Sequence, residues 1–263
     1  MYIRMPVAPK ILIEFAPYGN LRDFLVKRRP GAVRDVEELP LPHLRASHLI
    51  DFGQQVANGM DYISRQHRRT RIDAFQFVHR DLAARNVLVG SNFEAKIADF
   101  GLARKARDCF CDQNEGPMPV RWMAPESISH RCYTRKSDVW SFGVLLWEIF
   151  TFGGFPYPAF TEDSLLRAIQ AGIRNRQPRA CPASVYELML SCWFLDPLHR
   201  PTFKQIIDFL SQSYDRAIRF SSDNELVPEP RDEGATSESV EYHEDSGTID
   251  LSKYCYVDQG TYI

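Results

Sequence analysis

The sequence of 263 residues lacks several features that define other classes of protein. Its formal net charge is only −2, which argues against nucleic acid as the main partner because such partners select strongly basic surfaces. Its six cysteines are too sparse for a disulfide scaffold and lack the spacing of a zinc site, so we expect reduced thiols in a cytosolic compartment. A redox-active pair at Cys109 and Cys111 is the weaker alternative.

Long apolar runs are also missing. The most hydrophobic stretch, residues 139–157, contains Glu148 and ends in two glycines. It falls short of the roughly 20 uninterrupted apolar residues that a membrane span needs. Ser137 or Asp138 is expected to cap the helix that it forms, and a helix that is apolar on all sides is a buried central helix of a globular domain.

What is present divides into a folded body and a tail. The overall composition, 44% hydrophobic and 25% charged, is that of a globular protein. Residues 221–263 carry a net charge of −9, which leaves about +7 for residues 1–220. We therefore expect one folded unit over residues 1–219 and an acidic, disordered tail over residues 220–263.

The body reads as an α+β fold with few strands. Strands are predicted for residues 10–15 (buried), 75–78, 87–89 and 95–98. Asn20 is expected to cap a short helix, residues 21–29. Further helices are predicted for residues 48–66, 125–129, 138–151, 162–171, 184–194 and 203–219, with loops or insertions at 30–47 and 67–76.

Three short motifs carry the chemistry. They are His79-Arg80-Asp81-Leu82-Ala83-Ala84-Arg85-Asn86, then Asp99-Phe100-Gly101, then Ala124-Pro125-Glu126. Their order and the strand–loop–strand context between the first two match the signature set of protein kinases. The sequence resembles the protein kinase family over roughly residues 10–214, which implies a protein-kinase-like fold represented mainly by its helical C-terminal lobe.

The resemblance implies the transfer of the γ-phosphate of ATP, with Mg²⁺ as cofactor. Asp81 would accept the proton of the attacking hydroxyl, and Arg85 would supply a cation beside it. Asn86 and Asp99 would hold Mg²⁺ through hard oxygen ligands. On the nucleotide side, Ile13 would be the gatekeeper.

The other adenine contacts follow from the same likeness. The backbone groups of Glu14 and Ala16 would hydrogen-bond adenine, and Leu88 would form the floor of its pocket. Arg85 would contact the γ-phosphate, and Asp99 would contact the phosphates through the metal. Asp138 resembles the buried acid that anchors the catalytic loop, Glu126 and Arg200 match a buried ion pair, and His79 and Phe100 match an apolar stack.

Smaller signs indicate tyrosine specificity. Ala83-Ala84-Arg85 and the run from Pro119 to Glu126 are similar to receptor tyrosine kinases. Residues 11–25, 137–151 and 200–205 are closest to the fibroblast growth factor receptor group. That likeness implies a single-pass receptor whose catalytic part lies on the cytoplasmic side of the plasma membrane, and which dimerises through regions outside this chain.

The sequence departs from the family in two ways. No Gly-rich loop or Val-Ala-Ile-Lys segment occurs, so we expect a fragment in which Met1 is an internal start, inactive alone. If Met1 is the true start, the chain is instead a docking module or pseudokinase. The segment 99–126 contains no tyrosine, so we expect activation without a phosphotyrosine there.

The tail offers two short binding motifs. Tyr256-Val-Asp-Gln259 resembles a docking site for SH2-type partners after phosphorylation, and Thr261-Tyr-Ile263 resembles a C-terminal PDZ ligand. An inert, solvated tail is an equal alternative for each motif.

Overall fold

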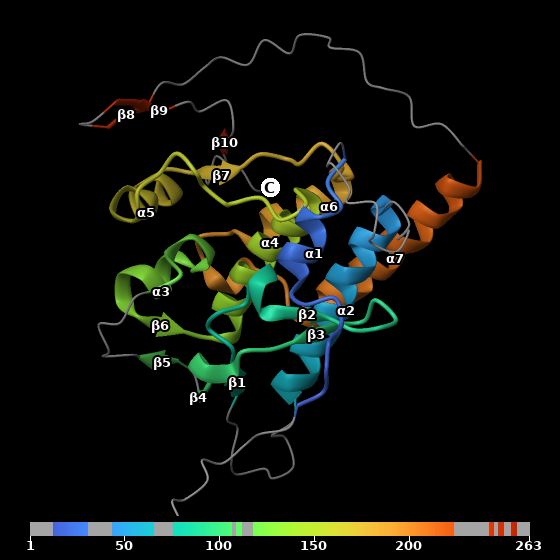
Figure 1. Ribbon diagram of the computed structural model, residues 1–263. Helices are drawn as coiled ribbons and strands as arrows, with labels where there is room; N and C mark the ends of the chain where they lie inside the picture. Colours follow the sequence, from blue (N-terminus) through green and yellow to red (C-terminus); the bar gives the residue numbers. More distant parts are fainter. Residues whose placement is uncertain are drawn as a thin grey trace, which may run out of the picture.

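The computed structural model describes residues 13–30, 44–65, 76–106, 109–111, 118–223, 242–244, 247–249 and 254–256 (Figure 1). Helices are the main regular secondary structure in this part of the chain. They are α1 (Leu21–Val26), α2 (Ala46–Arg65), α3 (Pro125–His130), α4 (Arg135–Phe150), α5 (Glu162–Gln170), α6 (Ala183–Cys192) and α7 (Phe203–Asp223). Single 3-10 turns are η1 (Ala84–Asn86), η2 (Phe100–Leu102), η3 (Val120–Trp122) and η4 (Pro197–His199).

The strands are short and pair two by two, always antiparallel. The pairs are β1 (Gln76–Val78) with β4 (Arg104–Ala106), β2 (Val87–Val89) with β3 (Ala95–Ile97), β5 (Phe110–Cys111) with β6 (Cys132–Tyr133), β7 (Ile173–Asn175) with β10 (Tyr254–Tyr256), and β8 (Tyr242–Glu244) with β9 (Gly247–Ile249). The fold is thus α+β and rich in helix, as the sequence predicts.

Helix α4 lies at the centre of the core. It is buried on nearly every side, including Trp140, Phe142 and Leu145, and it packs against α2 and α6, while α2 and α7 lie side by side (Figure 1). Gly143 permits the close approach of α6, because a Cβ there would lie 2.8 Å from the Cβ of Cys192. The prediction of a buried central helix is confirmed. Within the described residues no helix is both long and apolar enough to cross a membrane.

Helix starts follow local hydrogen-bond chemistry. Asn20 caps α1 by accepting from the Asp23 N–H at 2.9 Å, as predicted, although α1 ends three residues before the predicted Arg29. The cap predicted for the central helix is wrong. Thr134 caps α4 and forms a reciprocal capping box with Ser137. Its backbone is extended, and its side-chain hydroxyl accepts from free N–H groups in the first turn of the helix.

The buried strand predicted for residues 10–15 is wrong over residues 13–15. Ile13 and Phe15 are 81% and 83% exposed, and no described strand pairs with them. An apolar run forms a strand only where a neighbour satisfies its backbone and covers its side chains. Residues 10–12, 31–43 and 66–75, and therefore most of the predicted loop and insertion, lie outside the described residues.

The tail also differs from the prediction of disorder. Helix α7 continues to Asp223, and residues 242–256 contribute three short strands. One of them, β10, pairs with β7 in the register Tyr254↔Asn175, Cys255↔Arg174 and Tyr256↔Ile173. The prediction therefore fails for residues 254–256, because the β7 edge offers backbone partners that local composition does not reveal.

Candidate active site

A buried carboxylate fixes the loop that follows β1. Asp138, in the first turn of α4, accepts the backbone N–H of His79 at 2.8 Å and of Arg80 at 3.0 Å. Arg80 adopts φ = 74°, a left-handed conformation that side chains rarely take. The two hydrogen bonds hold this conformation, so the predicted anchoring role of Asp138 is confirmed. Burial raises the pKa of Asp138 to about 7, against the opposing effect of the two hydrogen bonds.

His79 joins this loop to the Asp99-Phe100-Gly101 turn. Its Nδ1 accepts the Asp81 N–H at 3.3 Å, and its Nε2 faces the carbonyl oxygen of Ala98 at 3.1 Å. The ring is therefore a neutral imidazole with its proton on Nε2, and burial lowers its pKa. The ring centre lies 5.1 Å from that of Phe100, which confirms the predicted stack.

Asp81, Arg85 and Asn86 converge as the sequence predicts. The Asn86 amide nitrogen donates to the Asp81 carbonyl oxygen at 2.8 Å and to its Oδ2 at 2.7 Å. Arg85 Nη2 forms an ion pair with Asp81 Oδ1. Both carboxylate oxygens thus accept from a fixed donor, and this fixes the rotation of the carboxylate. A carboxylate with a fixed orientation is able to accept a proton from a third partner.

Asn86 and Asp99 lie at the same end of the β2–β3 hairpin. The backbone N–H of Ala98 donates to the Asn86 carbonyl oxygen at 2.8 Å, which places Asp99 one residue beyond the pair. The Asn86 side-chain nitrogen donates to both the carbonyl oxygen and the Oδ2 of Asp81. The side-chain oxygen of Asn86 therefore faces away from Asp81. Asp99 adopts φ = 57°, and its Oδ1 accepts the Gly101 N–H at 3.3 Å.

This donor set fits Mg²⁺ rather than a metal with an all-protein cage. No cluster of three or more His, Cys, Asp or Glu that could hold a metal occurs within the described part of the chain. Mg²⁺ is held through one or two protein oxygens while phosphate and water supply the rest. One amide oxygen and one carboxylate, from Asn86 and Asp99, meet that requirement.

The residues predicted to contact adenine border a short backbone ladder. The Tyr18 N–H donates to Val89 O at 3.3 Å, and the Val89 N–H donates to Gly19 O at 2.9 Å. Leu88, half-buried, bridges to Asn20 inside this ladder. The structure thus brings Leu88 beside the segment that follows Ala16.

The three upstream residues are less enclosed. Ile13 is exposed, and the Glu14 side chain pairs with Lys96 at 3.1 Å. The carbonyl oxygen of Ala16 accepts the Gly19 N–H at 3.2 Å within a turn. Among the described residues, Ile13 and Glu14 therefore lie along an open edge, while Ala16 and Leu88 lie against the body of the domain.

Two residues that sequence reasoning did not assign connect this loop to a second element, η3. Glu148 of α4 is fully buried, and its Oε2 accepts both the Ala84 N–H and the Trp122 Nε1–H at 2.9 Å. Burial raises the pKa of Glu148 to about 7. Trp122 also lies beneath Arg85, whose guanidinium carbon is 4.4 Å from the ring centre. The sequence signal that could have pointed to Glu148 is the presence of an acid in the apolar stretch of residues 139–157.

The segment from Pro119 to Trp122 is itself firmly attached. Arg121 donates to the carbonyl oxygens of Tyr157 and Phe160, the latter at 2.7 Å. Ser141 Oγ donates to the Trp122 carbonyl oxygen at 2.7 Å. These hydrogen bonds hold residues 119–122, here called the shelf, in place beside the Asp81 loop.

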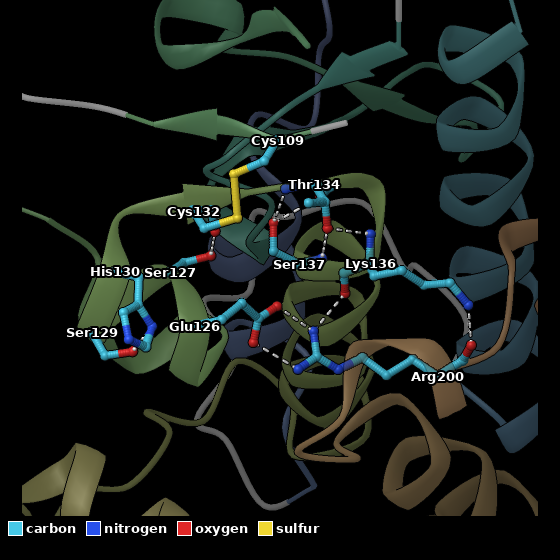
Figure 2. The surroundings of a disulfide bond; sticks show 10 residues. All are labelled: Cys109, Glu126, Ser127, Ser129, His130, Cys132, Thr134, Lys136, Ser137 and Arg200. Carbon is cyan, nitrogen blue, oxygen red and sulfur yellow. Dashed lines mark hydrogen bonds and ion pairs between the residues drawn. A yellow bond between two sulfur atoms is a disulfide. The ribbon is translucent and has the colours of Figure 1, made fainter. Parts of the chain in front are cut away.

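An ion pair between Arg200 and Glu126 lies next in the chain after the shelf. Arg200, with a fully buried side chain, bonds both carboxylate oxygens of Glu126 at 2.6 and 2.8 Å (Figure 2). The predicted pairing is confirmed. Arg200 also donates to the backbone carbonyl oxygens of Phe194 and Lys136, at 2.8 and 2.9 Å, so its remaining N–H groups are engaged.

The expectation of reduced cysteines is wrong in one place. Cys109 and Cys132 form a disulfide, with their Cα atoms 5.8 Å apart (Figure 2). The β5–β6 ladder brings the two segments together: Cys111 lies opposite Cys132, and Cys109, two residues earlier, comes close enough to form the bond. The alternative of a Cys109–Cys111 pair is also wrong. Cys181 and Cys192 are free, buried thiols, as expected.

A comparison with protein-family models agrees with this geometry. Residues 3–210 match the family described as protein tyrosine and serine/threonine kinase. The match covers the Asp81 loop, the Asp99 turn, the shelf and the Glu126–Arg200 pair.

Proposed function

Since the chain belongs to the protein tyrosine and serine/threonine kinase family, we propose that it carries the catalytic and peptide-binding lobe of a kinase specific for tyrosine. The family supports transfer of phosphate to protein substrates. The finer assignment, transfer of the γ-phosphate of ATP to the phenol of tyrosine, rests on the shelf beside Asp81.

The catalytic roles follow from the hydrogen bonds. Asp81 would accept the proton of the substrate hydroxyl, because Arg85 and Asn86 each bind one of its carboxylate oxygens and so fix its orientation. Asn86 and Asp99 would hold Mg²⁺, which supplies neutralisation of phosphate charge when bound. Leu88 and the backbone of Ala16 and Glu14 would position the adenine, with Ile13 at its edge.

The observation that carries tyrosine specificity is the position of Arg85 between Asp81 and Trp122. It couples the proton acceptor to the shelf on which the substrate main chain would lie. A phenol ring places its hydroxyl a full ring length from the main chain, whereas a serine hydroxyl stays close to it. A shelf set apart from Asp81 by the arginine and indole therefore favours the longer side chain.

The receptor role is part of the same proposal. The likeness to the fibroblast growth factor receptor group supports a place at the cytoplasmic side of the plasma membrane. The acidic tail supports docking of SH2-type partners at phosphorylated Tyr256 and PDZ-type partners at Ile263.

Peptide phosphorylation tests the specificity. The protein would be incubated with Mg²⁺, ATP and three peptides that differ only in Tyr, Ser or Thr. We expect phosphate on the tyrosine peptide alone, and none with the Asp81→Asn variant. Equal labelling of the serine peptide would overturn tyrosine specificity.

The docking-module alternative predicts a different result. If the transcript starts at Met1 and the protein transfers no phosphate, the intact tail should still bind an SH2 domain once a separate tyrosine kinase has phosphorylated Tyr256. The matched control is Tyr256→Phe. The sequence feature behind this alternative is the absence of a Gly-rich loop from the chain.

A further inference from the structure

The activation segment, residues 99–126, is attached to the domain by two strand pairs. Strand β4 pairs with β1, in the register Phe77↔Lys105, immediately before the Asp81 loop. Strand β5 pairs with β6, in the register Phe110↔Tyr133 and Cys111↔Cys132. Two ladders of two or three residues are weak on their own, because so few backbone hydrogen bonds barely offset the entropy of ordering the segment.

The Cys109–Cys132 disulfide reinforces the second ladder (Figure 2). Cys109 precedes β5, and Cys132 opens β6. Both residues are half-buried and thus closer to solvent than the free thiols of Cys181 and Cys192. Cys181 and Cys192 are buried, and burial raises the pKa of each thiol to about 12, which leaves them protonated and unreactive.

Strand β6 is a firm attachment point. Ser127 Oγ, in α3, donates to the Cys132 carbonyl oxygen at 2.7 Å. The next residue, Tyr133, is buried, and the guanidinium of Arg80 lies 4.3 Å from its ring centre. Its hydroxyl donates to the sulfur of Met118 at 3.5 Å, next to the shelf. A tether from Cys109 to Cys132 therefore connects the first half of the activation segment, through Tyr133, to the Asp81 loop and to the shelf later in the same segment.

We propose that Cys109 and Cys132 are a reversible oxidation site that clamps the activation segment in its docked position and so strengthens peptide binding. The effect on peptide binding rests on the proposed kinase function; the clamp itself does not. A segment without tyrosine has no phosphotyrosine to hold it, and a covalent bond between the same two elements supplies an equivalent restraint.

The chemistry requires a peroxide as oxidant. One thiolate attacks a peroxide oxygen, the O–O bond breaks, and the sulfur becomes a sulfenic acid while the leaving hydroxide takes a proton to form water. The second thiolate then displaces hydroxide from that sulfur, which forms the S–S bond and a second water. Two thiols lose two electrons, and one hydrogen peroxide gains them. A dithiol reductant reverses the process by thiol–disulfide exchange.

Mass spectrometry under non-reducing conditions tests the bond. The reduced 263-residue chain would be treated with one equivalent of hydrogen peroxide, alkylated in the native state and digested. We expect a Cys109–Cys132 cross-linked peptide, with Cys181 and Cys192 alkylated only after denaturation. The cross-link should disappear in Cys109→Ser and persist in Cys111→Ser, whose position opposite Cys132 makes it the matched control. A Cys111–Cys132 cross-link, or no cross-link, would overturn the proposal.

Hydrogen exchange and kinetics then test the clamp and its consequence. Oxidation should slow amide exchange in residues 104–111 in the wild type and in Cys111→Ser, but not in Cys109→Ser; equal exchange in both redox states would refute the clamp. In protein that transfers phosphate, oxidation should lower the KM for a tyrosine peptide by about threefold or more, with the KM for ATP unchanged. An unchanged peptide KM would refute the regulatory effect. Slowed exchange without any phosphotransfer would support the clamp and refute the proposed function instead.

Discussion

The guanidinium of Arg85 lies 4.4 Å from the centre of the Trp122 indole ring. One side chain thereby touches both the Asp81 carboxylate and the shelf at residues 119–122. Cation–π contacts with tryptophan are the strongest of their kind, on the order of 1–2 kcal/mol where water is partly excluded. The proton acceptor and the peptide shelf are therefore coupled through two non-covalent contacts of one residue.

Replacement of Arg85 should separate catalysis from nucleotide binding. In protein that phosphorylates a tyrosine peptide, we expect Arg85→Ala to lower kcat/KM for that peptide by about 10²-fold, because Asp81 loses a partner that orients it. The affinity for ATP in an equilibrium titration should fall far less, by about tenfold at most, because only the phosphate contact predicted for Arg85 is lost and the predicted adenine contacts lie elsewhere. Arg85→Lys is the matched control and should recover part of the activity. An equal loss of both quantities would contradict the positioning role.

Glu148 should make stability depend on pH. Its folded-state pKa of about 7 exceeds the ordinary value of 4.5, so the folded protein holds an extra proton between those limits. Stability from this group is therefore fully present below about pH 4.5 and is lost as pH rises through 7, by about 3 kcal/mol in total. In Glu148→Gln one amide oxygen can still accept from Ala84 and Trp122, because both hydrogen bonds go to the same oxygen.

Urea unfolding at pH 5 and pH 7.5 measures this effect. We expect the free energy of unfolding of the wild type to fall relative to that of Glu148→Gln as the pH rises, since only the wild type must ionise a buried acid. Other titrating groups, including Asp138, cancel in the comparison. A difference between the two proteins that does not vary with pH would show that Glu148 is ionised across the whole range.

Removal of either partner of the Glu126–Arg200 pair should lower the free energy of unfolding. Arg200→Met leaves the Glu126 carboxylate without its partner, and we expect a loss of about 3–5 kcal/mol in the free energy of unfolding. The exposed pair of Lys204 and Asp208, 3.8 Å apart, is the control, and Lys204→Met should change stability by less than about 1 kcal/mol. Equal effects of the two substitutions, measured by urea unfolding, would refute the importance of burial.

The parts of the site that the sequence predicted are local in the chain. Asp81, Arg85 and Asn86 lie within six positions, and a tight loop between two strands allows few arrangements of them. Asn86 and Asp99 are joined by the β2–β3 hairpin, so their proximity also follows from neighbouring elements. Helix positions in α2 and α4 were predictable because apolar spacing and buried length depend on sequence alone.

The parts that were missed depend on distant contacts. Glu148 meets Ala84 across 64 positions, and an isolated acid in an apolar helix does not reveal its partner. The Cys109–Cys132 bond depends on the register of a ladder two residues long, which spacing between cysteines cannot give. Residues 13–15 have the composition of a buried strand and yet are exposed, because burial depends on neighbours rather than on composition.

The pairing of β10 with β7 should protect backbone amides in both strands. The β7 edge is rigid because Arg174 and Asn175 are buried and bonded, Arg174 to the Trp193 carbonyl oxygen at 2.9 Å and Asn175 to the Tyr157 N–H at 3.0 Å. The edge of a rigid strand is a template for an added strand. Tyr256, the first residue of the predicted SH2 docking motif, pairs with Ile173 in this ladder. Strand pairing and binding of an SH2 domain therefore compete for the backbone of Tyr256.

Cys255→Pro tests that pairing, since proline removes a backbone N–H and disfavours a paired strand. We expect amide exchange in residues 173–175 to become faster by about tenfold or more in Cys255→Pro and to stay unchanged in the control Cys255→Ser. An SH2 domain should also bind phosphorylated Tyr256 more tightly in Cys255→Pro than in Cys255→Ser, because binding no longer competes with strand pairing. Equal exchange in the two variants would mean that the tail does not dock on β7 in solution.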